Sequence, residues 1–123
     1  GIPLPQLMDR ATFDKLAART AKAGGEIVAL LKTGSAFYSP ALSAVRMAEA
    51  YLRDSKSVQT VAAALDGEYG VAGGLPCGVP VIIGAQGVEK VVEISLDNEE
   101  KKAFDLSVAA VKELCDWVDK KIA

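Results

Sequence analysis

The sequence contains no histidine among its 123 residues and only two cysteines, Cys77 and Cys115. Without histidine, the chain has neither the Ser–His and Cys–His pairings of nucleophilic catalysis nor the commonest general base. The two cysteines stand far apart with no second soft ligand near either, which excludes the usual zinc spacings, so we predict no metal site. A disulfide between them is an alternative that the absence of secretory features disfavours.

Neither sign of charge is in large excess. The formal net charge is −2, with lysines and arginines interspersed among acidic residues, so we expect no nucleic-acid partner and no membrane-surface partner. The longest apolar runs, such as residues 79–85, fall far short of the about 20 residues of a membrane span, and no charged-then-apolar leader opens the chain. These absences predict a cytoplasmic location.

Half of the residues are apolar, which is enough to bury the core of one domain. Apolar spacing predicts helices over residues 12–32 and 40–53, and a third that begins at Asp97 or Asn98. Strands are predicted over residues 58–65, 79–84 and 88–96, with the glycine-rich stretch 70–78 as a loop. The predicted fold class is therefore α+β, with helices packed on an antiparallel sheet.

Three local patterns refine these elements. Thr12 is predicted to cap the first helix, and the pair Gly24-Gly25 predicts a kink or the close approach of another backbone. The last helix carries the most regular apolar stripe, which we expect to cover a sheet face. That stripe consists of Phe104, Val108, Val111, Cys115, Val118 and Ile122.

The stretch from Lys32 to Ala50 is the strongest candidate for a binding site. Its loop holds the small residues Gly34, Ser35 and Ala36, which allow another molecule to approach the backbone. Ser39 followed by Pro40 predicts an N-cap and a first helical residue. A helix N-terminus favours an anionic ligand, although an ordinary capped connection between two helices is the simpler interpretation.

The helix after Pro40 has an unusually flat face of small residues, namely Ala41, Ala44, Val45, Ala48 and Leu52. Such a face allows close approach, either to the sheet of the same domain or to a second subunit. No acid, base or nucleophile stands out anywhere in the chain, because its paired acids are expected on solvated surfaces.

Six segments in the same order resemble the C-terminal half of the malate/lactate dehydrogenase family, in its bacterial-type branch. They are residues 1–5 (GIPLP), 24–28 (GGEIV), 31–40 (LKTGSAFYSP), 47–52 (MAEAYL), 67–70 (GEYG) and 78–84 (GVPVIIG). The resemblance implies that residues 1–123 are part of the C-terminal substrate domain. The N-terminal dinucleotide-binding Rossmann domain would then lie outside this chain.

The same resemblance implies a role for the loop in a parent enzyme that interconverts malate and oxaloacetate with NAD. Ser35 and Gly34 match substrate-binding positions, and Ala36 and Pro40 match positions beside the nicotinamide. The substrate would be a small 2-hydroxy or 2-oxo dicarboxylic acid, and the parent a homodimer or homotetramer. No catalytic residue is expected in this chain, so the fragment should be inactive alone.

Two alternatives stay open at this point. The parent could be a lactate dehydrogenase of the same family, because the residues that choose between the substrates are expected outside this chain. The domain could also be a non-catalytic structural or oligomerisation module, in which the loop is only a helix cap. NADP is likewise an alternative to NAD as the cofactor.

Overall fold

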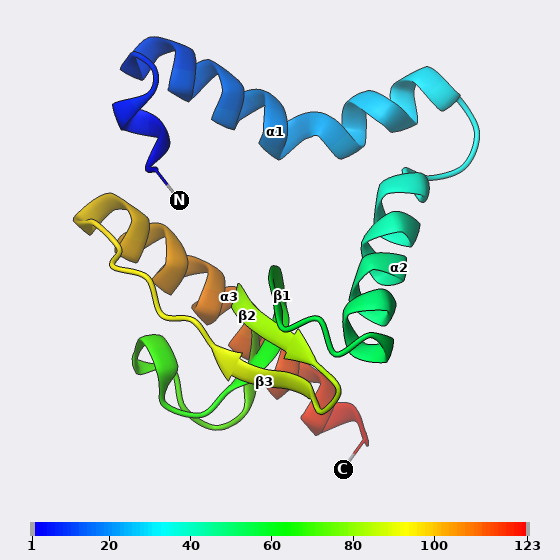
Figure 1. Ribbon diagram of the computed structural model, residues 1–123, viewed down its shortest axis with the longest axis vertical. Coiled ribbons are helices and arrows are strands. Elements are labelled where there is room, and N and C mark those ends of the chain that lie inside the picture. The colour runs from blue at the N-terminus through cyan, green and yellow to red at the C-terminus, as the bar shows by residue number, and fades with distance from the viewer. Residues whose placement is uncertain (1, 123) are drawn as a thin grey trace. The chain divides into compact units, whose positions relative to one another are not determined.

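The computed structural model describes residues 2–122, and the chain divides into two compact units, Gly1–Ala44 and Val45–Ala123 (Figure 1). The first unit contains the short 3-10 helix η1 (Leu4–Gln6), the long helix α1 (Arg10–Leu31) and the start of α2 (Tyr38–Leu52). The second contains the rest of α2, the sheet and α3 (Asn98–Ile122). Within residues 2–122, no helix is both long and apolar enough to cross a bilayer.

Helix α1 begins two residues before the predicted start. The Asp9 carboxylate accepts a hydrogen bond from the Thr12 amide at 2.9 Å and another from the Thr12 hydroxyl at 2.8 Å. The prediction of Thr12 as the cap is therefore wrong, because an ionised carboxylate three residues upstream is the stronger acceptor for the free amides of the first turn.

The glycine pair does not interrupt this helix. α1 is continuous from Arg10 to Leu31, although its ribbon bends along its length (Figure 1), so the predicted kink at Gly24-Gly25 stays a prediction. A Cβ added at either glycine would meet no atom of a described residue within 4 Å. No close backbone approach within the described chain therefore explains the pair.

Helix α2 begins at Tyr38, earlier than predicted. The Ala41 amide donates to the Phe37 carbonyl at 3.0 Å, which closes the first turn. Ser39 is thus inside the helix, not its N-cap, and Pro40 is its third residue rather than its first. Pro40 is tolerated there because the amides of a first turn have no intrahelical partner to lose.

The sheet has three antiparallel strands in the order β1–β2–β3, namely Ser57–Leu65, Leu75–Gly84 and Gly87–Val91 (Figure 1). β1 pairs with β2 from Ser57 opposite Ile83 to Leu65 opposite Leu75. This long register adds Leu75–Gly78 to the second strand, so the prediction of a loop through residue 78 is partly wrong. Partners distant in the sequence decide where a strand begins.

β3 ends at Val91 instead of continuing to Leu96. The Tyr69 hydroxyl donates to the Val92 carbonyl at 2.9 Å and accepts from the Ile94 amide at 3.0 Å. The Val92 amide still donates to the Pro80 carbonyl of β2 at 2.8 Å, and beyond it the Tyr69 hydroxyl takes the place of a neighbouring strand.

Helix α3 packs on the sheet along β2 (Figure 1). Asp97 caps it as predicted: its carboxylate accepts from the amides of Glu99 and Glu100, while the Glu100 carboxylate accepts from the Asp97 amide. The core between helix and sheet is apolar, with Leu65, Val79 and Val81 almost fully buried. The predicted α+β class, with helices on an antiparallel sheet, is confirmed.

The predicted stripe of α3 covers the sheet only over its first part. Phe104, Val108, Val111 and Cys115 are half-buried, whereas Val118 is 44% and Ile122 is 78% exposed. Ala50, near the end of α2, also joins the core at 4% exposure.

Candidate functional site

The candidate site is the loop that joins α1 to α2. The chain leaves α1 at Lys32, whose amide still donates to the Val28 carbonyl at 3.0 Å although its φ is already 62°. The Thr33 amide then donates to the Leu31 carbonyl at 2.7 Å. These tight bonds end the helix within two residues and start the loop at Gly34.

Gly34 has a φ of +88°, a left-handed conformation that glycine adopts without steric cost. A Cβ at this position would lie 3.5 Å from the Phe37 ring, an ordinary contact, so backbone strain is what selects glycine here. The Phe37 amide donates to the Ser35 carbonyl at 2.9 Å and makes the loop compact.

The four predicted site residues lie close together at the start of α2. Gly34, Ser35 and Ala36 are consecutive, and Pro40 lies in the first turn of the helix. Gly34, Ser35 and Pro40 are exposed, while Ala36 is half-buried. The Ser35 hydroxyl makes no hydrogen bond to a described residue, so it is available to an external acceptor.

The electrostatic setting suits a negatively charged group. The first turn of α2 carries no acidic side chain, so nothing in that turn neutralises the positive end of the helix dipole. The rings of Phe37 and Tyr38 lie next to each other, with centroids 4.8 Å apart, and both are largely exposed. The loop therefore offers a hydroxyl, a small-residue surface and an apolar flank.

This arrangement can bind and position a ligand, but it carries no group that transfers a proton. The Ser35 hydroxyl makes no hydrogen bond to a described side chain that could act as its base, and the sequence contains no histidine. Among residues 2–122 no three acidic or cysteine side chains come together as a metal site would require. Whether Ser35, Gly34, Ala36 and Pro40 contact substrate or cofactor stays a prediction.

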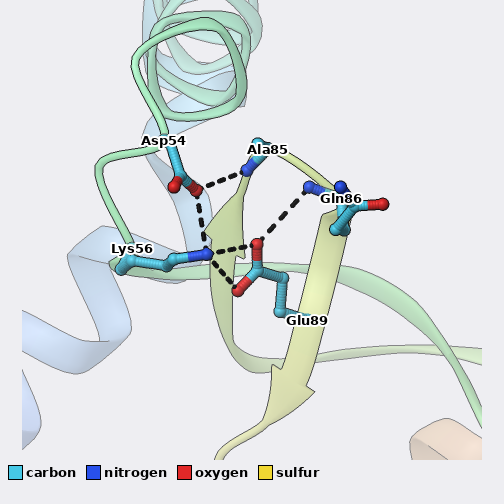
Figure 2. Close-up of polar contacts among 5 residues, drawn as sticks. All are labelled: Asp54, Lys56, Ala85, Gln86 and Glu89. Carbon is cyan, nitrogen blue, oxygen red and sulfur yellow. Dashed lines mark hydrogen bonds and ion pairs between the residues drawn. The ribbon is translucent and has the colours of Figure 1, made fainter.

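Sequence reasoning missed an ionic cluster at the other end of α2 (Figure 2). Lys56 Nζ lies 2.7 Å from both carboxylate oxygens of Glu89 and 2.9 Å from Asp54 Oδ1. Asp54 Oδ1 also accepts from the Ala85 amide at 2.7 Å. The Lys56 ammonium thus links the segment after α2 to β3, and Asp54 links the same segment to the turn before β3.

Lys56 and Asp54 each stabilise the charged form of the other. Hydrogen bonds to Glu89 and then Asp54 raise the pKa of Lys56 above 10.5, and bonds from Lys56 and the Ala85 amide lower the pKa of Asp54 below 3.8. Asp54 and Lys56 both adopt a positive φ, 47° and 50°. No local motif marks these residues, because Glu89 lies on β3, 33 positions after Lys56. In this cluster one ammonium bridges two carboxylates, so it is a structural link with a net negative charge.

A model of the lactate/malate dehydrogenase alpha/beta C-terminal domain matches residues 2–121. The malate dehydrogenase of Methylobacterium radiotolerans is 53% identical over all of this chain and 41% of its own length. This chain therefore spans about two fifths of the length of that relative.

Solved structures agree with this result. The Salinibacter ruber malate dehydrogenase superposes with a TM-score of 0.89 at 45% identity, over 98% of this chain and 39% of that chain. A Cryptosporidium parvum lactate dehydrogenase, complexed with lactic acid and nicotinamide adenine dinucleotide, superposes with a TM-score of 0.88 at 38% identity, over 97% and 39%.

Proposed function

The chain belongs to the lactate/malate dehydrogenase family as its alpha/beta C-terminal domain, and we propose that it is the substrate-domain part of an NAD-dependent malate dehydrogenase. The parent would interconvert malate and oxaloacetate by hydride transfer. The observation that carries the choice of substrate is the 53% identity to a malate dehydrogenase across the full chain, against 38% for the lactate dehydrogenase with bound lactic acid.

The loop would form one wall of the pocket. The Ser35 hydroxyl, exposed and without a described partner, would donate to a substrate carboxylate, and Gly34 would let that carboxylate approach the backbone. The acid-free first turn of α2 would favour its negative charge. Both features fit an anionic 2-hydroxy acid.

Ala36 and Pro40 would lie beside the nicotinamide. Their side chains are small or rigid and uncharged, so they would offer a flat ring an apolar surface without competing polar groups. NAD, when bound, supplies the acceptor for the hydride of the substrate carbon. The rest of the parent would hold most of the cofactor.

The chain by itself should be inactive. A 2-hydroxy acid must lose its hydroxyl proton when its carbon gives up a hydride, and no side chain at the loop is placed to accept that proton. We therefore assign the base to the part of the parent that precedes this domain.

The parent would be a homodimer or homotetramer that uses α2. The flat face predicted from the sequence stays exposed, since Val45 is 54% and Leu52 is 79% exposed, while it is Ala50 that packs in the core. A second subunit is the partner that fits this face.

Lactate is the competing substrate, because lactate dehydrogenase structures superpose almost as well. Reconstitution decides between the two. This chain would be mixed with the complementary N-terminal part, and NADH oxidation followed with oxaloacetate and with pyruvate, each part alone serving as control. We expect turnover of oxaloacetate by the mixture only. A folded complex that reduces neither acid would refute the proposal, and one that prefers pyruvate would identify a lactate dehydrogenase.

A further inference from the structure

Helix α1 carries an apolar face without a partner in the part of the chain that the structure describes. None of the 22 residues of α1 is buried, and the side chains of Leu16 and Leu30 are 49% and 77% exposed. Helices in proteins owe most of their stability to the packing of one apolar face. The face of α1 is therefore free to receive another element.

This face has the form of a straight seam. Its residues recur at alternating intervals of three and four, and they are Phe13, Leu16, Thr20, Ala23, Ile27 and Leu30. Such a repeat runs along one side of a helix and is the pattern that packs lengthwise against a second helix. A shallow depression of about 470 Å³ lies along the seam, and all the residues that line it belong to α1. The seam therefore fits a helix.

The polar groups on and beside the seam are already paired within α1. The Thr20 hydroxyl donates to the Leu16 carbonyl at 2.8 Å. The Arg19 guanidinium donates to both carboxylate oxygens of Glu26, at 3.0 and 3.2 Å. Burial of a polar group is costly mainly where the group has no hydrogen-bond partner. A helix could therefore cover the seam without leaving these groups unsatisfied, and its own contacting surface should be apolar and uncharged.

We propose that a helix from the part of the parent that precedes this domain packs lengthwise on the seam. This inference rests on the proposed function, which makes the chain the C-terminal domain of a longer dehydrogenase. The matched part is 41% of the length of the Methylobacterium radiotolerans malate dehydrogenase, so nearly three fifths of that relative lies outside it. Such a length is ample to supply the helix.

The point of attachment favours this occupant over a second copy of the chain. The short helix η1 contacts α1, and Leu4 and Leu7 beside it are 50% and 61% exposed. A part of the parent that is joined ahead of η1 is thereby held near α1. A tethered partner has an effective concentration of about millimolar, whereas a second copy is present only at its concentration in solution.

The test compares the melting temperatures of four lysine variants of the full-length parent. Leu16→Lys and Leu30→Lys place a charge in the seam. Ala18→Lys and Ala29→Lys are matched controls, because both alanines are exposed and lie on the opposite side of α1. We expect each seam variant to melt at least about 3 °C below the wild type, and the two controls to melt with it. Equal melting temperatures for all four variants would overturn the proposal.

The same four variants of this chain alone test the other occupants. Because Leu16 and Leu30 are exposed here, we expect all four to melt like the wild-type chain and to sediment with its mass. A lower melting temperature of the seam variants alone would place the occupant within this chain. Loss of self-association in the seam variants alone would identify a second copy. Either result would overturn the proposal.

These measurements do not depend on which acid the parent reduces. A parent that reduces neither oxaloacetate nor pyruvate would refute the proposed function, whereas selective destabilisation by the two seam variants would still support the docked helix. An active parent in which all four variants melt equally would overturn the docked helix alone.

Discussion

Lys56 and Glu89, which are 33 positions apart in the sequence, meet end to end: the ammonium nitrogen lies 2.7 Å from each carboxylate oxygen. Asp54 approaches the same nitrogen from the other side at 2.9 Å. These contacts, with the hydrogen bond from the Ala85 amide to Asp54, join the end of α2 to the β2–β3 hairpin (Figure 2). The loss of stability on removing the Lys56 charge should therefore depend on pH.

Lys56→Met should lower the urea midpoint at neutral pH, because Asp54 and Glu89 would face each other without a cation. The pKa of Asp54 is lowered in the folded state, so its contribution is complete above 3.8 and is lost as the pH falls below that value. The pKa of Lys56 is raised, so its contribution holds below 10.5 and is lost as the pH rises through the folded value. The difference between wild type and variant should therefore shrink below pH 3.8 and above pH 10.5. Lys90→Met, on the exposed surface of β3, is the control and should give no such profile.

Gly84→Ala should be destabilised by about 1–3 kcal/mol, the usual range for an overpacked site. A Cβ at Gly84 would lie 2.7 Å from Asp54 Oδ1 and would also press on the Glu89 carboxylate. Gly78→Ala is the matched control on the same strand, since its Cβ would meet nothing within 4 Å. Chemical denaturation of both variants checks the difference, and equal midpoints would contradict the packing around Gly84.

Tyr69→Phe should cost about 1–3 kcal/mol, because the Val92 carbonyl and the Ile94 amide both lose their partner. The ring itself remains and keeps its contact with Phe104, at 5.3 Å between centroids. Tyr51→Phe removes a hydroxyl from a side chain that is 50% exposed and should be nearly neutral. Hydrogen exchange of the Ile94 amide should rise in Tyr69→Phe alone; unchanged exchange would refute this role.

Gly25→Ala should stabilise the isolated chain by about 1 kcal/mol, since glycine is the poorer helix former and the site is open. Gly34→Ala should have the opposite effect, because its φ of +88° strains any residue with a Cβ. Thermal melts of the two variants test both predicted changes in stability, a higher melting temperature for Gly25→Ala and a lower one for Gly34→Ala. Destabilisation by Gly25→Ala would show that another element packs against α1 after all.

Features determined by neighbouring residues were predictable from the sequence. The Asp97 cap depends on residues within the first helical turn. The first strand, which spans Ser57–Leu65 in the structure, depends on the pattern of its own side chains. The start of β2 and the end of β3 were not predictable, because they depend on the pairing of Leu65 with Leu75 and on the Tyr69 hydroxyl. Such contacts join segments that local patterns treat separately.

The candidate site, too, was only partly predictable from the local sequence. The small residues of the loop and the nearby helix N-terminus were evident locally, although the cap at Ser39 was assigned wrongly because Phe37 closes the first turn. The functional roles of Ser35 and Ala36 came from the family resemblance, since composition cannot specify a ligand. The pairing of Lys56 with Glu89 could not be predicted, because the sequence around either residue does not indicate its partner 33 positions away.

The most direct test of whether Ser35 forms part of the substrate-binding wall is steady-state kinetics of Ser35→Ala in the full-length parent, with oxaloacetate as the varied substrate. Loss of a hydrogen bond to a charged group costs about 1.5–3 kcal/mol, so we predict a fall in kcat/KM of roughly 10- to 100-fold, mainly through KM. Ser107→Ala, on the exposed surface of α3, should match wild type. A kcat/KM for Ser35→Ala equal to that of Ser107→Ala would show that Ser35 does not contact the substrate.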